Sequence, residues 1–128
     1  MNVNDIVSGV YVRLGTANIP TEISAAHIID LANDRIEDIN LFTGQTVSGN
    51  DIPARFVSPL KDLVTADVMA RTLGIDIDTE IGVGNIRLGY RDQFLAENRQ
   101  IEYFLKKAEG SLNNTGRVMR FGTTTKVG

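Results

Sequence analysis

An apolar stripe in the last third of the chain places the strongest constraint on its fold. Phe94, Ile101, Leu105, Ala108 and Leu112 follow one another at spacings of seven, four, three and four residues. These intervals place the five side chains on one face of an α-helix. The sequence therefore predicts a helix over about residues 91–112, which at ~1.5 Å per residue is long enough to cross a small domain. We expect the shorter helices to pack against it.

Composition places the chain among ordinary globular proteins. Its 128 residues are 42% hydrophobic and 23% charged, which fits one compact domain. It contains no cysteine, which excludes disulfides, thiolate metal sites and a cysteine nucleophile. No apolar run approaches the ~20 residues of a membrane helix, and the polar, acidic residues 1–5 are unlike a signal peptide. We expect no membrane association.

Charge is distributed unevenly along the chain. Residues 1–109 contain all 16 acidic residues and 10 of the 13 basic residues, a net charge of −6. The remaining stretch carries Arg117, Arg120 and Lys126 and no acid, a net charge of +3. The acidic main part argues against sequence-independent DNA binding, which needs basic groups to neutralise phosphates. The basic tail is suited to an acidic protein surface or a phosphate backbone.

Three shorter amphipathic helices are predicted before residue 75. Their expected spans are about residues 4–14, 21–42 and 58–73. A glycine follows each helix, the usual stop because glycine readily adopts a left-handed backbone; these are Gly15, Gly44 and Gly74. The candidate capping residues at their starts are Asn4 or Asp5, Thr21 or Ser24, and Ser58. Pro59 after Ser58 suits the first helical position, and residues 52–57 are open to adding one turn before it.

Two stretches have the pattern of extended chain. Residues 75–89 alternate apolar with other residues and contain three glycines, which indicates a short hairpin or a long loop. After a break at residues 113–116, the valines and threonines of residues 117–128 favour an extended form. The predicted fold is therefore mainly α: a small bundle of about four helices over residues 1–112, followed by an extended tail over residues 113–128.

None of the familiar chemical motifs is complete. Gly82 and Gly84 begin a dinucleotide-binding pattern, but its third glycine position holds Arg87. The alternating acids of residues 76–80 begin like a calcium loop, which then lacks the glycine and the final carboxylate that it requires. His27 is the only histidine, so it cannot form a multi-histidine metal site, and we expect it on a helix surface. The sequence predicts no catalytic residue, no cofactor and no metal, and hence no enzyme.

The order of these features resembles that of the head–tail connector (adaptor) proteins of tailed bacteriophages. A capped mid-chain helix ending at Gly74 is followed by a glycine-containing segment, a long final helix and an extended tail. In that family a similar segment lies between the last two helices. Gly84, Asn85 and Ile86 match its glycine, acid or amide, and hydrophobic residue, with Asn85 where the family usually has aspartate. The similarity covers about residues 21–112 and is one of architecture.

The resemblance implies a structural role in the virion. Proteins of this family form a homo-oligomeric ring, typically a dodecamer, between the portal protein of a filled capsid and a tail or stopper protein. The ring extends the channel, and DNA passes through it without sequence-specific binding. For this chain the resemblance implies the same partners, synthesis in the host cytoplasm and a final location at the head–tail interface.

A ring subunit needs two different side surfaces, because cyclic assemblies are built from heterologous contacts. The acidic face of the second predicted helix is the candidate for one side. Basic residues farther along the chain are candidates for the other: Arg87, Arg91, Arg99 and Lys106. An acidic channel lining would also let DNA slide, because it does not neutralise phosphates.

The C-terminal residues are the candidate site for binding the portal or a tail component. They are Arg117, Val118, Met119, Arg120, Phe121, Thr123, Thr125, Lys126 and Val127. Their extended bias suits addition of a strand to an exposed sheet edge, and Arg120 beside Phe121 provides residue types enriched in interface hot spots. We expect this tail to be loose in the free subunit, so that deleting residues 117–128 leaves thermal stability nearly unchanged.

A function of another class uses the same residues. The chain fits a small helical nucleic-acid-binding module, such as a packaging subunit or a regulator, that acts through its basic tail. Salt-dependent DNA binding by the isolated protein would distinguish this function from a connector ring.

Overall fold

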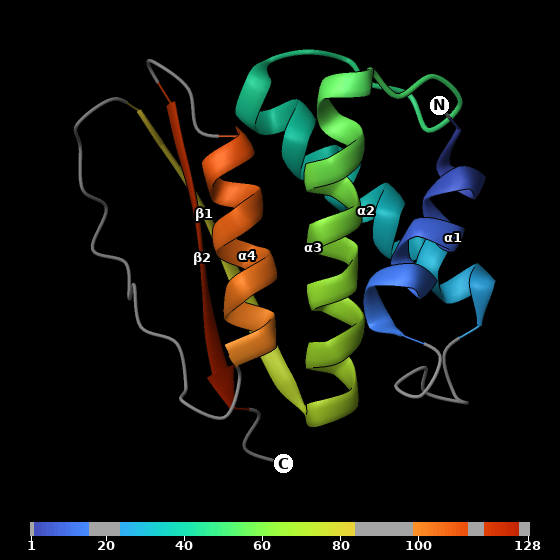
Figure 1. Ribbon diagram of the computed structural model, residues 1–128. Helices are drawn as coiled ribbons and strands as arrows, with labels where there is room; N and C mark the ends of the chain where they lie inside the picture. Colours follow the sequence, from blue (N-terminus) through green and yellow to red (C-terminus); the bar gives the residue numbers. More distant parts are fainter. Residues whose placement is uncertain (1, 16–23, 84–98, 113–116, 126–128) are drawn as a thin grey trace.

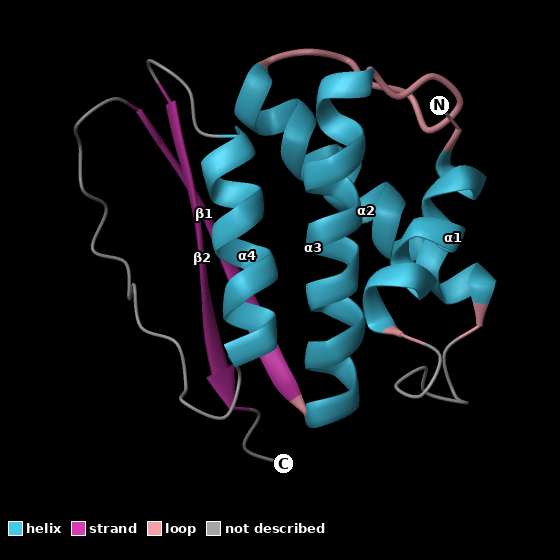
Figure 2. Cartoon of the chain, in the orientation of Figure 1, coloured by secondary structure: helices cyan, strands magenta, loops and turns pink. Residues whose placement is uncertain are grey.

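Four helices and two strands make up the computed structural model, which describes residues 2–15, 24–83, 99–112 and 117–125 (Figure 1). The elements are α1 (Val3–Leu14), α2 (Ala25–Thr43), α3 (Ala54–Leu73), β1 (Ile75–Val83), α4 (Arg99–Leu112) and β2 (Arg117–Thr125). Figure 2 shows the strand pair beside a layer of helices. The predicted mainly helical fold is confirmed. None of the described helices is long and apolar enough to span a membrane.

Helix α3 lies at the centre of the fold. It stands between α1 and α4, and α2 crosses behind it (Figure 1). Its buried apolar side chains are Phe56, Leu60, Leu63, Val64, Ala66, Val68 and Ala70. A helix that is buried on several sides is the interior helix of a bundle. The prediction that the final helix provides the common packing surface is therefore wrong, because that surface belongs to α3.

The final helix packs against α3 through the predicted stripe. Ile101, Leu105, Ala108 and Leu112 are all buried. Phe94 and the rest of residues 91–98 lie outside the described residues. A strongly one-sided stripe belongs to a helix that covers a core from outside, and α4 has this position.

The three predicted glycine stops are confirmed. Among the described residues, positive φ angles occur only at Gly15, Gly44 and Gly74, at 72°, 72° and 69°. Each glycine follows the last residue of a helix and donates its backbone N–H to that helix. A residue with a Cβ would be strained in this conformation, so the sequence fixes these ends.

The helix starts match the prediction less closely. Ser24 caps α2, which confirms one of the two alternatives, and its side chain accepts the N–H of His27. Asn2 caps α1 in place of Asn4 or Asp5, and Asp5 completes a reciprocal capping box with it. This box satisfies two backbone N–H groups at once, which neither predicted cap provides.

The third helix includes the additional turn before Ser58 that the sequence left open. It starts at Ala54, so Ser58 does not cap it and Pro59 lies inside the helix. Pro59 has no N–H to donate to the carbonyl one turn earlier, which ordinarily weakens a helix. Burial of Phe56 and Leu60 in the core offsets this loss, and the early turn forms.

Strand β1 pairs with the C-terminal strand. The two are antiparallel over their whole length, with Ile75 opposite Thr125 and Val83 opposite Arg117. One of the two forms predicted for residues 75–89 was a local hairpin. That prediction is wrong for residues 75–83, because their partner strand comes after α4 in the chain. Residues 84–89 lie outside the described residues.

The C-terminal strand also corrects the prediction of a loose tail. Phe121 lies in β2, is fully buried and belongs to the core cluster. Register places Phe121 on the same face as Ile77 of β1, which packs against that core. The tail has few apolar residues, but one large aromatic ring in a closed core is enough to hold the strand. Residues 126–128 lie outside the described residues.

Replacing Leu105 with Ala should lower the free energy of unfolding by ~2–5 kcal/mol, because the side chain is fully buried. The matched control is Lys106→Ala, which removes the exposed pair with Glu102 and should cost less than ~0.5 kcal/mol. Urea denaturation followed by circular dichroism measures both values. Equal losses in the two variants would contradict the assignment of Leu105 to the core.

Candidate interaction surface

A buried arginine joins α2, α3 and β2. Arg35 of α2 donates from Nε to Oδ2 of Asp67 (2.7 Å) and from Nη2 to Oδ1 of the same carboxylate (2.6 Å). Its Nη1 donates to Oδ2 of Asp38 at 3.1 Å. Above the pair, the guanidinium carbon lies 5.3 Å from the centre of the Phe121 ring. This geometry combines a two-pronged ion pair with a cation–π contact.

Burial has the largest effect on the ionisation of this pair. Burial alone would lower the pKa of Arg35, but the hydrogen bonds and charges of Asp67 and Asp38 outweigh it and raise that pKa. Burial raises the pKa of Asp67, against the opposing effect of Arg35. Each charge is therefore tolerated in the interior only because the other is present.

Helix α4 holds the same strand from another side. The backbone N–H of Phe121 donates to Oε1 of Glu109 at 2.9 Å. A backbone N–H on an edge strand is a point where another chain can pair. Glu109 occupies this one, so strand addition at that point requires the carboxylate to be displaced.

The predicted partner-binding residues are divided between β2 and the undescribed end of the chain. Those in β2 are Arg117, Val118, Met119, Arg120, Phe121, Thr123 and Thr125. Lys126 and Val127 lie outside the described residues. Phe121 anchors the strand to its own core, and register places Glu80 of β1 opposite Arg120.

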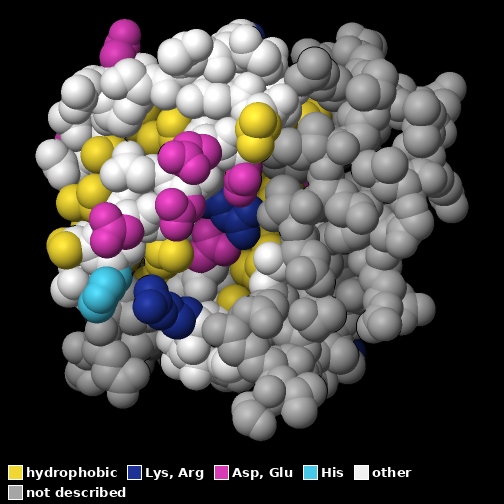
Figure 3. Space-filling view, turned by 180° about the vertical axis from the view of Figure 1, so that it is seen from behind, with side chains coloured by type: hydrophobic (Ala, Val, Ile, Leu, Met, Phe, Trp, Pro, Cys, Tyr) yellow, Lys and Arg dark blue, Asp and Glu magenta, His cyan; other side chains and the backbone are white. Residues whose placement is uncertain are grey.

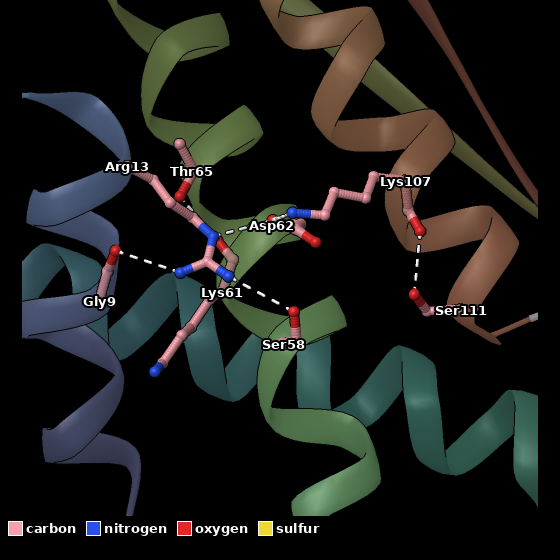
Figure 4. Close-up of polar contacts among 8 residues, drawn as sticks. All are labelled: Gly9, Arg13, Ser58, Lys61, Asp62, Thr65, Lys107 and Ser111. Carbon is pink, nitrogen blue, oxygen red and sulfur yellow. Dashed lines mark hydrogen bonds and ion pairs between the residues drawn. The ribbon is translucent and has the colours of Figure 1, made fainter.

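A second ion-pair cluster joins α1, α3 and α4 (Figure 4). Asp62 of α3 is fully buried, and its Oδ1 accepts a hydrogen bond from Nε of Arg13 at 2.8 Å. Nζ of Lys107 lies 4.0 Å from the same oxygen. Among the described residues, the other oxygen, Oδ2, has no hydrogen-bond partner. Two cations thus face one carboxylate, and the cluster has a net charge of +1.

The Arg13 side chain is fixed in place by further contacts. Its Nη1 donates to the carbonyl of Gly9 and its Nη2 to the hydroxyl of Ser58, each at 3.4 Å (Figure 4). At Gly9 a Cβ would lie 2.5 Å from Cε of Lys61, so the glycine leaves room for the Lys61 side chain beside α1. Arg13 is consequently presented with little freedom to move.

A groove opens beside this second cluster. It has a volume of about 350 Å³ and its lining includes Arg13 and Leu14 of α1, Met69 of α3, and Arg99, Gln100 and Tyr103 of α4. Tyr103 is 59% exposed and packs edge-on against Phe104, with ring centres 5.3 Å apart. Its ring also lies 5.9 Å from Nζ of Lys107. The described lining residues are therefore mainly apolar or aromatic, with two arginines, one glutamine and no acid among them. We call it the basic groove.

Acidic side chains are exposed along α2, which passes behind α3. Seen from behind, Asp and Glu side chains gather in one area of the described surface (Figure 3). Exposed residues of α2 contribute Asp30, Asp34 and Glu37, and Leu41 follows at 69% exposure. These four residues are spaced four, three and four apart, so they form one stripe along the helix. We call it the acidic stripe.

The single histidine has a local role at the start of α2. His27 is exposed, and its Nδ1 lies 3.4 Å from the backbone nitrogen of Ser24, completing the capping arrangement there. Its predicted place on a helix surface is confirmed. Within the described ranges, no three acidic or histidine side chains are grouped so as to hold a metal ion.

Sequence reasoning missed both buried ion pairs. By its charge alone Arg35 is expected at the edge of the apolar stripe of the second helix, whereas it is buried. The sequence does contain a signal of this burial, because Arg35 falls within the helical pattern of Ile28, Ile36 and Ile39. What the pattern does not provide is the partner, because Asp67 is on another helix.

In comparisons with protein families, curated proteins and solved structures, nothing matches this chain. The resemblance to phage connector proteins therefore rests on the order of elements within the chain itself.

Replacing Asp67 with Ala should destabilise the protein by ~3–5 kcal/mol, because it leaves Arg35 charged and buried without its main partner. The combined change Arg35→Met and Asp67→Leu should cost far less, because no charge is then left buried. Thermal and urea unfolding of the three proteins test this. A double variant as unstable as the single one would show that the pair is needed beyond charge balance.

Replacing Phe121 with Ala should cost ~3–5 kcal/mol, because a fully buried ring is lost from the core. Deleting residues 117–128 removes the same ring and all of β2, so it should destabilise the subunit at least as much. Unfolding midpoints of both variants provide the test. A truncated protein with unchanged stability would restore the prediction of a loose tail.

Proposed function

We propose that this protein is a structural subunit of a tailed-phage head–tail connector, forming a ring between the portal and the tail and extending the DNA channel. The observation that carries the proposal is the order α3, β1, α4, β2. An extended segment lies between the last two helices, and an extended C-terminal stretch follows the final one. This is the order in which the sequence resembles that family.

The charge distribution supports a ring. One face carries the acidic stripe and another the basic groove, so the subunit has two unlike surfaces. Heterologous contacts of this kind close into rings when the rotation between subunits allows it. The partners of the ring are the portal protein on one side and a tail or stopper protein on the other, and its location is the head–tail interface of the virion.

The C-terminal stretch is the proposed docking element for the portal or tail. Arg117 and Arg120 lie in β2, and Lys126 follows it. Phe121 is buried in the core and fixes β2 to its own domain, so the strand itself is a rigid element. A rigid element loses less conformational entropy on binding than a loose one.

The alternative, a nucleic-acid-binding module, relies on the same three cations. Glu80 stands opposite Arg120 in the strand register, which reduces the positive charge of this part of the sheet. Duplex DNA binding that weakens steeply as salt rises would favour the alternative.

The test uses DNA-filled, tailless heads that carry a portal, purified from the phage whose genome encodes this chain. The protein should co-sediment with the heads and appear by electron microscopy as a ring at one vertex. Replacing Arg117 and Arg120 with Glu should reduce co-sedimentation by about tenfold, because opposed charges across an interface set its specificity.

The matched control is Arg55→Glu, which makes the same kind of charge change at an exposed position in the first turn of α3. It should leave attachment unchanged. Wild-type protein that fails to bind portal-bearing heads would contradict the proposed function.

A further inference from the structure

We propose that the basic groove binds the acidic stripe of a second copy of this chain. The inference rests on the proposed function, because it identifies the contact that would join neighbouring subunits of the ring. It concerns two described surfaces on different helices, the α1–α3–α4 groove and the outer side of α2.

The two surfaces are complementary in charge. Arg13 and Arg99 line the groove, and the cluster behind Arg13 retains a net positive charge because Lys107 and Arg13 share one carboxylate. The stripe presents Asp30, Asp34 and Glu37. Opposed charges of this kind fix the register of an interface and accelerate association.

The two surfaces also match in their apolar parts. The groove contains Met69 and the half-exposed ring of Tyr103. The stripe ends in Leu41, whose side chain is 69% exposed. An exposed leucine on a helix and an aromatic-lined groove are the two halves of a helix-in-groove contact. Over the ~16 Å from Asp30 to Leu41, the stripe offers three negative charges and one apolar side chain, and the groove offers two positive charges beside apolar and aromatic side chains.

The placement of the surfaces favours a head-to-tail contact. Helices α1, α3 and α4 lie at the front of Figure 1, whereas α2 passes behind α3, and the acids gather on the rear face in Figure 3. Because the two surfaces face different ways, the groove of a copy stays open after its own stripe has bound. Each added subunit can therefore accept another, as a ring requires.

The groove has a fixed shape before any partner binds. Arg13 is held by Asp62, Gly9 and Ser58, and Tyr103 by its contacts with Phe104 and Lys107. Preorganised side chains lose little entropy on binding, so more of the contact energy appears as affinity.

The absence of cysteine makes a direct test possible. Asn33 is exposed on α2 beside the stripe, and Gln100 is exposed in the groove. The variant carrying both Asn33→Cys and Gln100→Cys should give a ladder of disulfide-linked multimers under mild oxidation. Each single variant should give no product larger than a dimer. A double variant without a ladder would overturn the proposal.

Charge reversal adds the specificity test. In the double-cysteine background, Arg99→Glu should reduce the ladder by about tenfold, and so should the paired change Asp34→Lys and Glu37→Lys. Combining all three reversals should restore it, because the charges are opposed again. The controls Arg55→Glu and Asp51→Lys change exposed charges outside both surfaces and should have no effect.

The outcomes separate this inference from the proposed function. If the charge-reversal variants still form rings on portal-bearing heads, the connector function is supported and the groove–stripe contact is refuted. A ladder with the expected charge dependence, from a protein that does not bind heads, would support the contact and refute the connector function.

Discussion

The Arg35–Asp67 pair is the interaction on which the arrangement of the chain depends. It joins α2 to α3 inside the core, and the Phe121 ring of β2 lies over it. Removing the strand would uncover the guanidinium, and removing the carboxylate would leave a buried cation beneath an aromatic ring. Buried pairs rarely add much net stability, yet they penalise every arrangement that separates the partners. The pair therefore acts mainly by selecting one packing of the helices.

Local features of the fold were predictable from the sequence, and long-range ones were not. Gly15, Gly44 and Gly74 end their helices as expected, because the backbone conformation at a stop depends on the residue there. The inward stripe of α4 was also predictable, since 3.6-residue periodicity is a local signal. The central position of α3 was missed because burial on several sides removes that periodicity. Pairing of β1 with β2 was missed because it depends on Phe121 finding a core built by other elements.

The same division applies to the candidate interaction surfaces. The acidic side of α2 and the basic Arg99 were evident in the sequence as charge patterns. Arg13 was not, because its importance comes from Asp62 of another helix, which fixes it at the rim of the groove. The C-terminal residues were predicted as a mobile docking arm. Residues 117–125 instead form β2, which Phe121 attaches to the core of the subunit, a form suited to an assembly in which geometry must repeat from copy to copy.

The chain order of the two paired strands affects how the protein is made. Helix α4 separates β1 from β2, so a ribosome releases β1 well before the strand that completes the sheet. Until β2 has been synthesised, the backbone N–H and C=O groups of β1 that pair with β2 lack these partners, and the core position of Phe121 is empty. Pairings between distant segments form slowly, and waiting strands are the parts of a nascent chain most prone to wrong association. Early termination of translation before β2 would therefore release a chain exposed to aggregation, and its yield in cells would depend on chaperones that shield β1.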